Sequence, residues 1–502
     1  MPIAKVFSAA VWGLEALPVE VEADVATGLP QFTIVGLPDK SIQESRKRVV
    51  SAITNSGYDF PGGKVTVNLA PADLKKIGPA YDLPIALAVM LAFGLRPAEE
   101  IEQAAFCGEL ALDGKVRPIS GALPIALGAR QHKLRTLFVP KENAAEASHV
   151  PGVSVIPVSH FTQLVDHITG QRLIDWFRPR QNRTEPQYEV DIGYIAGQEQ
   201  VKRGLEIAAA GGHHILMSGP PGGGKTLLAR ALPSILPSMN NEEQLEVSKI
   251  YSIAGLLNND QPLISERPFR TPHHTASAIS LVGGGTYPKP GEISLAHRGV
   301  LFLDEMPEFP RYVLESLRQP LEDGQVSVAR VAGSHRFPAR FTLVGTANPC
   351  PCGYLSDPTR HCRCTTTQVL NYRKKISGPL LDRIDIHLEV PKVPYQKLSE
   401  HLVAEASDKL RERVDQARRR QINRQGKTNA ELTIPELKRY AELSESLKKF
   451  FERAVATINL TARGYHRIIK VARTITDLAG EPDIFQDALA EAVSYRQKED
   501  WG

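Results

Sequence analysis

The sequence predicts an α/β protein built around a parallel sheet, and three observations support this. A glycine-rich phosphate-binding pattern follows a short apolar run at residues 215–217. Further apolar runs that end in polar residues, at 300–305 and 341–348, alternate with helical segments. After residue 394 the sequence is helical in character and rich in Glu, Lys, Arg, Ala and Leu. We therefore expect a parallel sheet with helices on both faces, preceded by another α/β domain and followed by an all-helical region.

Length and composition indicate a globular protein of several domains. The chain has 502 residues, and at ~150 residues per domain this predicts about three domains. The net charge of +4 is too small to indicate a nucleic-acid partner by itself. The longest apolar run, Leu83 to Leu95, is shorter than the ~20 residues that span a bilayer and predicts a buried helix. With five cysteines and no signal-peptide pattern, we expect a cytoplasmic protein with no membrane segment.

Composition shifts along the chain predict the domain boundaries. Short β-rich runs at 31–35 and 64–69 alternate with helical segments in the first part of the chain. A polar stretch rich in Arg and Pro at 178–186 is typical of a linker. The expected divisions are an α/β domain, a linker, the phosphate-binding domain and a helical region, at residues 1–175, 176–190, 191–394 and 395–502.

The phosphate-binding pattern is the most specific motif. It matches G-x-x-x-x-G-K-[ST] over Gly219, Pro220, Pro221, Gly222, Gly223, Gly224, Lys225 and Thr226. Its glycines allow successive backbone N–H groups to point at phosphate oxygens, while Lys225 reaches the β- and γ-phosphates and Thr226 binds Mg²⁺. A chance glycine-rich loop is disfavoured, because strand, loop and helix follow in the required order. The motif therefore predicts binding of ATP or a similar triphosphate with Mg²⁺.

Two further strand ends carry groups suited to phosphoryl transfer. The apolar run 300–303 ends in Asp304, which would hold Mg²⁺, and Glu305, which would polarise the attacking water. The run 341–347 ends in Asn348, which would hydrogen-bond the γ-phosphate or the water. The alternative for Asn348 is an ordinary turn residue at a strand end.

Two arginines are candidates for stabilising the charge that develops on the transferred phosphoryl group. Arg383 lies in the segment 377–385, and Arg463 lies near the start of a predicted helix. An arginine supplied to a neighbouring subunit would require an oligomer such as a ring. A surface salt bridge is the alternative for either residue alone.

The order of these motifs resembles the AAA+ ATPases, and specifically the magnesium-chelatase clade. The stretches 272–277, Pro-His-His-Thr-Ala-Ser, and 290–299, Pro-Gly-Glu-Ile-Ser-Leu-Ala-His-Arg-Gly, are similar to its YifB/ComM branch. The resemblance covers nearly the whole chain. It implies a helical lid at the C-terminus and an ATP-driven ring, expected to be a hexamer, that moves branched DNA junctions. The motifs alone indicate only a nucleotide hydrolase.

The first domain resembles the proteolytic domain of Lon-type proteases, through residues 78–80 and 108–116. A Ser/Lys dyad needs a hydroxyl nucleophile and a nearby base of lowered pKa. Ala80 stands at the nucleophile position and Leu123 at the lysine position. The domain is therefore expected to be an inactive scaffold, which helps to form the ring or contacts DNA.

Two segments are candidates for DNA contact. Residues 325–337 predict a hairpin with Arg330, His335 and Arg336 near its tip, and in the resembled clade such a hairpin faces the central pore. The second segment contains Arg267 and Arg270, with an aromatic ring between them. Packing against a neighbouring subunit is the alternative for both. The basic run 411–427 also suits phosphate, although a solvated helix face is the commoner explanation of such a run.

Four of the five cysteines form two closely spaced C-x-C pairs. These are Cys350, Cys352, Cys362 and Cys364, with His361 as a substitute ligand. Four thiolates suit a structural Zn²⁺, but the pairs are tighter than the usual zinc spacing. The sequence leaves zinc and free thiols open. Two alternatives to the DNA motor also remain: a chelatase-type motor subunit and a nucleotide-controlled assembly factor.

Overall fold

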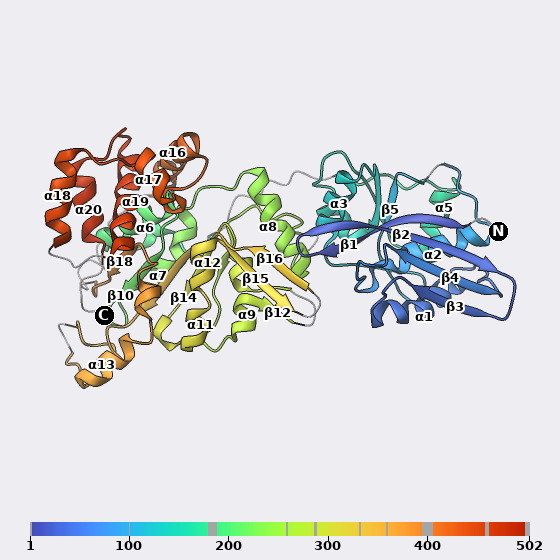
Figure 1. Ribbon diagram of the computed structural model, residues 1–502, viewed down its shortest axis with the longest axis horizontal. Helices are drawn as coiled ribbons and strands as arrows, with labels where there is room; N and C mark the ends of the chain where they lie inside the picture. Colours follow the sequence, from blue (N-terminus) through green and yellow to red (C-terminus); the bar gives the residue numbers. More distant parts are fainter. Residues whose placement is uncertain are drawn as a thin grey trace. The chain divides into compact units, whose positions relative to one another are not determined.

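The computed structural model describes residues 3–99, 101–178, 188–257, 260–285, 289–330, 333–357, 360–393, 405–456 and 461–496. The chain forms two compact units (Figure 1). The first comprises Met1–Thr184 and Gln244–Ile264, and the second comprises Glu185–Glu243 and Ser265–Gly502. Every helix among the described residues is too short or too polar to cross a membrane.

The first unit is built on a mixed seven-stranded sheet. The strand order is β3-β4-β2-β1-β5-β8-β9. The pairs β1/β2 and β2/β4 are antiparallel, and the other pairs are parallel. The strands predicted at 31–35 and 64–69 are present as β3 and β4. The strands are β1 (Ala4–Trp12), β2 (Glu15–Ala26), β3 (Gln31–Val35), β4 (Lys64–Ala70), β5 (Ala104–Phe106), β8 (Thr136–Pro140) and β9 (Ser154–Val158), beside a small hairpin of β6 (Glu109–Leu110) and β7 (Val116–Arg117).

Helices cover both faces of this sheet, so its strands contribute side chains to two cores. Along β8, Leu137 and Val139 enter the core on the α3 side, while Phe138 enters the core on the α2 side. Helix α2 is buried almost all round, as its uniformly apolar sequence predicts. The helices are α1 (Lys40–Asn55), α2 (Asp82–Phe93), α3 (Ala122–Gln131), α4 (Ala144–Ala147) and α5 (Phe161–Ile168).

Residues 244–264 belong to the first unit, although they lie within the predicted phosphate-binding domain. They include most of α8 (Asn241–Ala254). Leu245 packs against the core on the α3 side, and the Gly121 N–H donates to the Ser252 carbonyl at 3.0 Å. These contacts are long-range, so no local pattern reveals them.

The second unit contains the expected parallel sheet. Its five strands are parallel in the order β11-β14-β17-β10-β18. The strands are β10 (Ile215–Ser218), β11 (Phe269–Arg270), β14 (Val300–Leu303), β17 (Thr342–Ala347) and β18 (Ile386–Glu389). Two hairpins accompany them, formed by β12 (Gly283–Gly284) with β13 (Lys289–Pro290) and by β15 (Gln325–Arg330) with β16 (Gly333–Pro338).

The C-terminal region is helical, as predicted, and shares one apolar core with the sheet. Leu410 and Ile468 lie in the same buried cluster as Ile386. The helices of this unit are α6 (Glu199–Gly211), α7 (Lys225–Ala231), α9 (Ala278–Val282), α10 (Glu292–Leu295), α11 (Arg311–Glu315), α12 (Arg318–Asp323), α13 (Thr366–Arg373), α14 (Gly378–Leu381), α16 (Ser407–Gln425), α17 (Ile434–Tyr440), α18 (Glu445–Ala456), α19 (Ala462–Ala479) and α20 (Gln486–Ser494).

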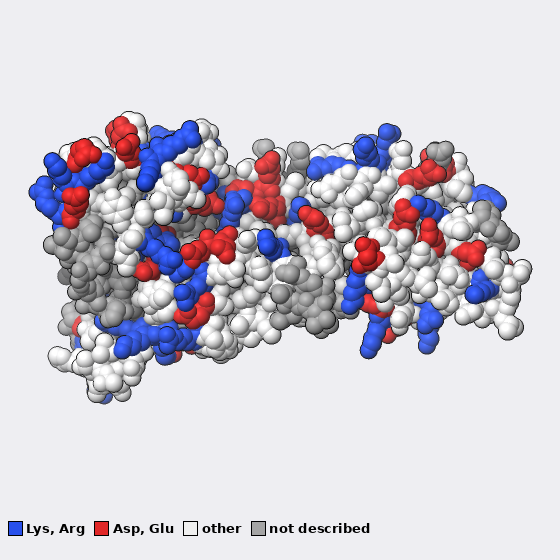
Figure 2. Space-filling model, in the orientation of Figure 1, with Lys and Arg blue, Asp and Glu red and all other residues white. Residues whose placement is uncertain are grey.

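The basic run on α16 is largely engaged within the unit. Arg418 donates to the carbonyls of Ala209 and Ala210 at 2.8 and 2.9 Å. Arg413 pairs with Glu206 at 2.7 Å. These two arginines fasten α16 to α6, while Arg420 and Arg424 of the same run bond to Asp477 of α19. On the face seen in Figure 2, acidic and basic side chains are interspersed over both units, with a denser basic group beside α13.

Candidate functional site

The phosphate loop joins β10 to α7 at the carboxyl edge of the parallel sheet. Gly222 and Gly224 have φ values of 80° and 87°, which L side chains rarely adopt. A Cβ on Gly219 would overlap the carbonyl oxygen of Val390, the residue after β18. The glycines are thus required by the turn and by close backbone contact, and they leave room for phosphate oxygens.

The Lys225 ammonium lies against its own loop. Its Nζ donates to the carbonyls of Gly219 and Pro220 at 2.6 and 2.9 Å, and to Asn348 Oδ1 at 3.1 Å. Burial lowers the pKa of Lys225, against the opposing field of Asp304 and Glu305. The structure thus brings Lys225 and Asn348 into direct contact.

The second pair of site residues meets around the Asp304 carboxylate. Thr226 Oγ1 donates to one of its oxygens at 3.0 Å, and Thr346 Oγ1 donates to the other at 2.6 Å. The Glu305 N–H in turn donates to Thr346 Oγ1 at 2.8 Å, and Glu305 adopts a left-handed φ of 50°. A hydroxyl and carboxylate oxygens are ligands that Mg²⁺ prefers, so these residues fit the ion that the motif predicts.

Thr346 was not among the predicted site residues. It lies near the carboxyl end of β17, which runs parallel to β14, with Leu303 opposite Gly345. One hydroxyl there orients both Asp304 and the backbone of Glu305. A hydroxyl residue two positions before Asn348, close to the carboxyl end of a mostly apolar strand, is the signal that could have identified it.

The two candidate arginines lie together, at the other edge of the sheet. Arg383 precedes the amino end of β18, and both it and Arg463 form ion pairs with Glu322 of α12; the Arg463 pair measures 3.5 Å. Arg383 is buried, whereas Arg463 is exposed. The phosphate loop follows the carboxyl end of β10, so neither arginine lies beside it.

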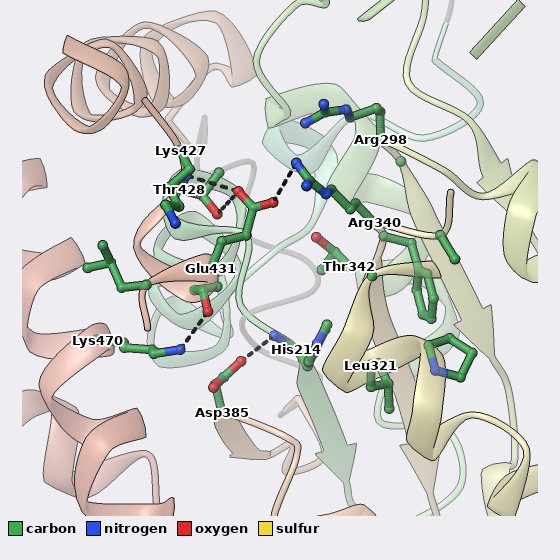
Figure 3. Close-up of a pocket in the computed structure, with 18 of the residues that line it drawn as sticks. His214, Arg298, Leu321, Arg340, Thr342, Asp385, Lys427, Thr428, Glu431 and Lys470 are labelled. Atoms are coloured by element: carbon green, nitrogen blue, oxygen red, sulfur yellow. Dashed lines mark hydrogen bonds and ion pairs between the residues drawn. The ribbon is translucent and has the colours of Figure 1, made fainter. Parts of the chain in front are cut away.

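A cavity of about 600 Å³ opens at this amino edge, between the strand starts and the C-terminal helices (Figure 3). His214, Thr342 and Asp385 stand at the amino ends of three strands, while Glu431 and Lys470 come from the helical region. The lining therefore comes from two parts of the second unit.

Most charges that face this cavity already have partners. Arg340 pairs with Glu431 at 3.5 Å, and Arg467 pairs with Asp385. Although burial opposes it, the charge of Arg467 keeps the pKa of Asp385 well below its usual value. Lys470 donates to the Ala430 carbonyl at 2.8 Å, and burial lowers its pKa to about 8. This cavity lies between the sheet and the C-terminal helices. It is at the opposite edge of the sheet from the residues that are predicted to bind the nucleotide.

The predicted hairpin is present as the antiparallel pair β15/β16. Arg336 is exposed, but His335 is only 8 % exposed, and burial lowers its pKa. The side chain of Arg330 lies outside the described residues. Of the predicted contacts on this hairpin, Arg336 is the one that the structure describes as accessible.

The second predicted DNA segment is more constrained. The Arg267 side chain is 10 % exposed and donates to the carbonyls of Pro237 and Arg298, at 2.6 and 2.7 Å. It also pairs with Glu243 at 3.0 Å. Arg270 forms a bidentate pair with Glu292 at 2.7 and 2.9 Å. These contacts stabilise the surrounding loops, which fits a structural role for Arg267 better than a direct DNA contact.

The four clustered cysteines converge. Their sulfur atoms all lie within 4.8 Å of one another, and His361 is not part of the group. The cluster lies on the loop between β17 and α13, directly after Asn348. The sequence left this convergence open.

The first unit offers no Ser/Lys dyad at the Lon-like positions. Ala80 has no nucleophile, and its carbonyl accepts a hydrogen bond from the Gly108 N–H at 2.9 Å. Leu123 is fully buried in the core on the α3 side. A lysine at that position would lie in an apolar environment, which the present leucine fills without cost.

Comparisons with known proteins agree with the motif order. Residues 191–398 match the family described as magnesium chelatase, subunit ChlI, and residues 21–143 and 404–496 match two further ChlI families, the latter its C-terminal part. The protein YifB of Salmonella typhimurium is 44% identical over 500 residues, which cover 99% of this chain and 97% of that protein.

The chain belongs to the YifB/ComM family of the magnesium-chelatase clade. Competence protein ComM of Haemophilus influenzae is 43% identical over 503 residues, which cover 99% of this chain and 98% of that protein. A Lon protease of Mycoplasmopsis agalactiae is 26% identical over 151 residues, which are 28% of this chain and 15% of that protein. The N-terminal region accounts for this Lon similarity. Membership of this AAA+ family implies ATPase activity with ATP and Mg²⁺, and an oligomeric assembly.

Proposed function

We propose that this protein is an ATP-driven ring translocase that acts on DNA and promotes branch migration during recombination or natural transformation. The observation that carries the proposal is the separation of the arginines from the phosphate loop across one sheet. An arginine can stabilise the transition-state charge when a second protein chain supplies it, so the separation supports hydrolysis at the contact between two subunits, as in a ring.

At the carboxyl edge, each of the predicted site residues would have a separate role in hydrolysis. ATP with Mg²⁺ supplies the reactive phosphate and its counter-ion. Lys225 would leave the loop carbonyls to neutralise the β- and γ-phosphates, and Thr226 and Asp304 would hold the metal. Glu305 would orient and polarise the attacking water, and Asn348 would bind the water or the γ-phosphate.

The arginine that stabilises the charge developing on the transferred phosphoryl group would come from a neighbouring subunit. A four-residue strand spans roughly 13 Å, so Arg383 at the amino edge cannot reach phosphates bound beyond the carboxyl edge of its own sheet. A head-to-tail interface would place Arg383 and Arg463 against the next subunit's nucleotide. Repeating that interface closes a ring, for which we propose six subunits.

The hairpin β15/β16 is the proposed DNA contact. In the ring it would project into the pore, where exposed Arg336 would meet backbone phosphates. The relative in Haemophilus influenzae is named as a competence protein, which also directs the proposal towards DNA. A cytoplasmic location suits a motor that uses ATP and DNA.

The test is steady-state ATP hydrolysis with no DNA, duplex, single strands and a four-way junction. Lys225→Ala should abolish hydrolysis in every arm. We expect the junction to stimulate the wild type, and Arg336→Ala to reduce that stimulation while leaving the DNA-free rate unchanged. Arg453→Ala, which removes an exposed arginine from α18, is the matched control. Hydrolysis that no DNA changes would reject the translocase and favour a chelatase-type motor or an assembly factor.

A further inference from the structure

The loop after β17 brings four sulfur atoms into one small volume. The Cys350 sulfur lies 3.3 Å from that of Cys352 and 3.6 Å from that of Cys362, and the Cys352 and Cys362 sulfurs are 3.6 Å apart. With Cys364, all four lie within 4.8 Å of one another. A tetrahedron of thiolates with Zn–S bonds of about 2.3 Å has sulfurs about 3.8 Å apart. We propose that these four cysteines hold one structural Zn²⁺.

The backbone around the sulfurs suits thiolates. Four thiolates around Zn²⁺ leave a net charge of −2, which nearby N–H donors stabilise. The N–H of Cys364 donates to the Cys362 sulfur at 3.4 Å. Backbone N–H groups of Tyr354 and Arg363 also donate to Cys352. These donors make the loop a suitable outer shell for a charged metal site.

Other uses of four close cysteines fit less well. A four-iron cluster binds each thiolate through a different corner of a cube, so its sulfurs lie farther apart than around one ion. Two disulfides would join sulfurs in pairs, whereas here three sulfurs are mutually within 3.6 Å. A single tetrahedral ion is the arrangement in which all four sulfurs are equivalent ligands.

The metal loop also touches the nucleotide site. A Cβ added to Gly353, directly after Cys352, would lie 2.8 Å from Pro221 Cδ and 3.8 Å from Asn348 Cγ. The loop is therefore packed against both the phosphate loop and the residue that contacts Lys225. If the proposed ATPase function is correct, the metal holds Asn348 and Pro221 in place for nucleotide.

The first experiment needs no variant. The full-length protein, purified under reducing conditions, should contain about one zinc per chain by elemental analysis. After removal of zinc, titration with Co²⁺ should produce thiolate-to-cobalt charge-transfer bands and the strong visible bands of a tetrahedral site, saturating at one equivalent. Zinc-free protein that binds neither Zn²⁺ nor Co²⁺ would overturn the proposal, as would stoichiometric iron.

Variants then assign the ligands. Cys352→Ser and Cys362→Ser should each lower bound zinc at least about tenfold, whereas Cys107→Ala, a buried cysteine of the first unit, should retain it. Zinc retained by both serine variants would reject the cysteine cluster as the site. Binding of a fluorescent ATP analogue tests the link to the nucleotide: zinc removal should weaken it severalfold. One zinc bound with unchanged nucleotide binding would keep the metal site and reject only its role at the phosphate loop.

Discussion

The two edges of the parallel sheet in the second unit differ in the partners of their charged side chains. At the carboxyl edge, the hydrogen bonds that the described residues form with Lys225 and Asp304 come from the site itself, namely loop carbonyls, Asn348 and threonine hydroxyls. At the amino edge, a cavity of about 600 Å³ is lined by charges that pair across it, including Arg467 with Asp385. The volume of the cavity therefore does not identify the functional site here. The better indication is which partners the charged groups have, because the groups at the carboxyl edge are held by the phosphate loop and its neighbours, whereas those at the amino edge neutralise one another.

The physical basis of the difference lies in strand direction. All strands of a parallel sheet end at one edge, where loops and helix N-termini present N–H groups to an anion. At the amino edge the C-terminal helices cover the strand starts, and buried charges there need partners. The arginines on Glu322 are the exception, since they lie at the amino edge but are proposed to act on a neighbour.

The largest expected effect tests whether the two arginines act on the nucleotide of a neighbouring subunit. Arg383→Ala should lower ATP hydrolysis about a thousandfold, and Glu305→Gln in a separate chain should lower it about 100-fold or more. In a mixed ring, the phosphate loop of the arginine variant can meet the intact arginine of the glutamine variant. An equal mixture should therefore regain about a quarter of wild-type activity. Arg463→Ala, at an exposed position, repeats the test without a buried change.

No recovery in rings shown to contain both chains would contradict action between subunits. It would place the arginines with their own phosphate loop, and the contrast between the edges would then be wrong. Size-exclusion chromatography with one tagged chain verifies the mixing.

A smaller effect isolates the carboxyl edge. Glu305→Gln should lower hydrolysis about 100-fold or more through loss of the group that polarises water, with ATP affinity unchanged. The backbone N–H bond to Thr346 survives this substitution. Glu308→Gln, at the partly exposed acid three residues on, should leave the rate unchanged. Equal losses in both variants would mean that general loss of negative charge, rather than water activation, is responsible.

The smallest effect concerns stability at the amino edge. The pKa of Lys470 is lowered from 10.5 to about 8, so the folded state binds this proton less tightly than the unfolded state does. The cost of burying the charge is fully present below pH 8 and is relieved as the pH rises from 8 to 10.5. Lys470→Met should therefore stabilise the protein at pH 7 by about 2 kcal/mol, after allowance for partial exposure.

Denaturant unfolding of both proteins at pH 7 and pH 10 measures this. The difference should shrink towards pH 10, and ATP hydrolysis should be unaffected at pH 7. A methionine variant that hydrolyses ATP poorly would show that the amino-edge cavity takes part in catalysis.

The sequence by itself determined the carboxyl edge of the site. Residues 219–226, Asp304, Glu305 and Asn348 each follow an apolar run, and in a parallel sheet all such runs end at one edge. The hairpin β15/β16 and the helical C-terminus also followed from local periodicity and turn residues. These features depend on neighbours in the chain, which sequence patterns record directly.

Only the tertiary structure decided which distant groups meet. It placed Arg383 with Arg463 on Glu322, four sulfurs around one point, and Arg267 within a shell of carbonyls. It also assigned residues 244–264 to the first unit. Such contacts join residues far apart in the chain, and their partners are selected by packing and by the need to pair buried charges. No local pattern carries that information.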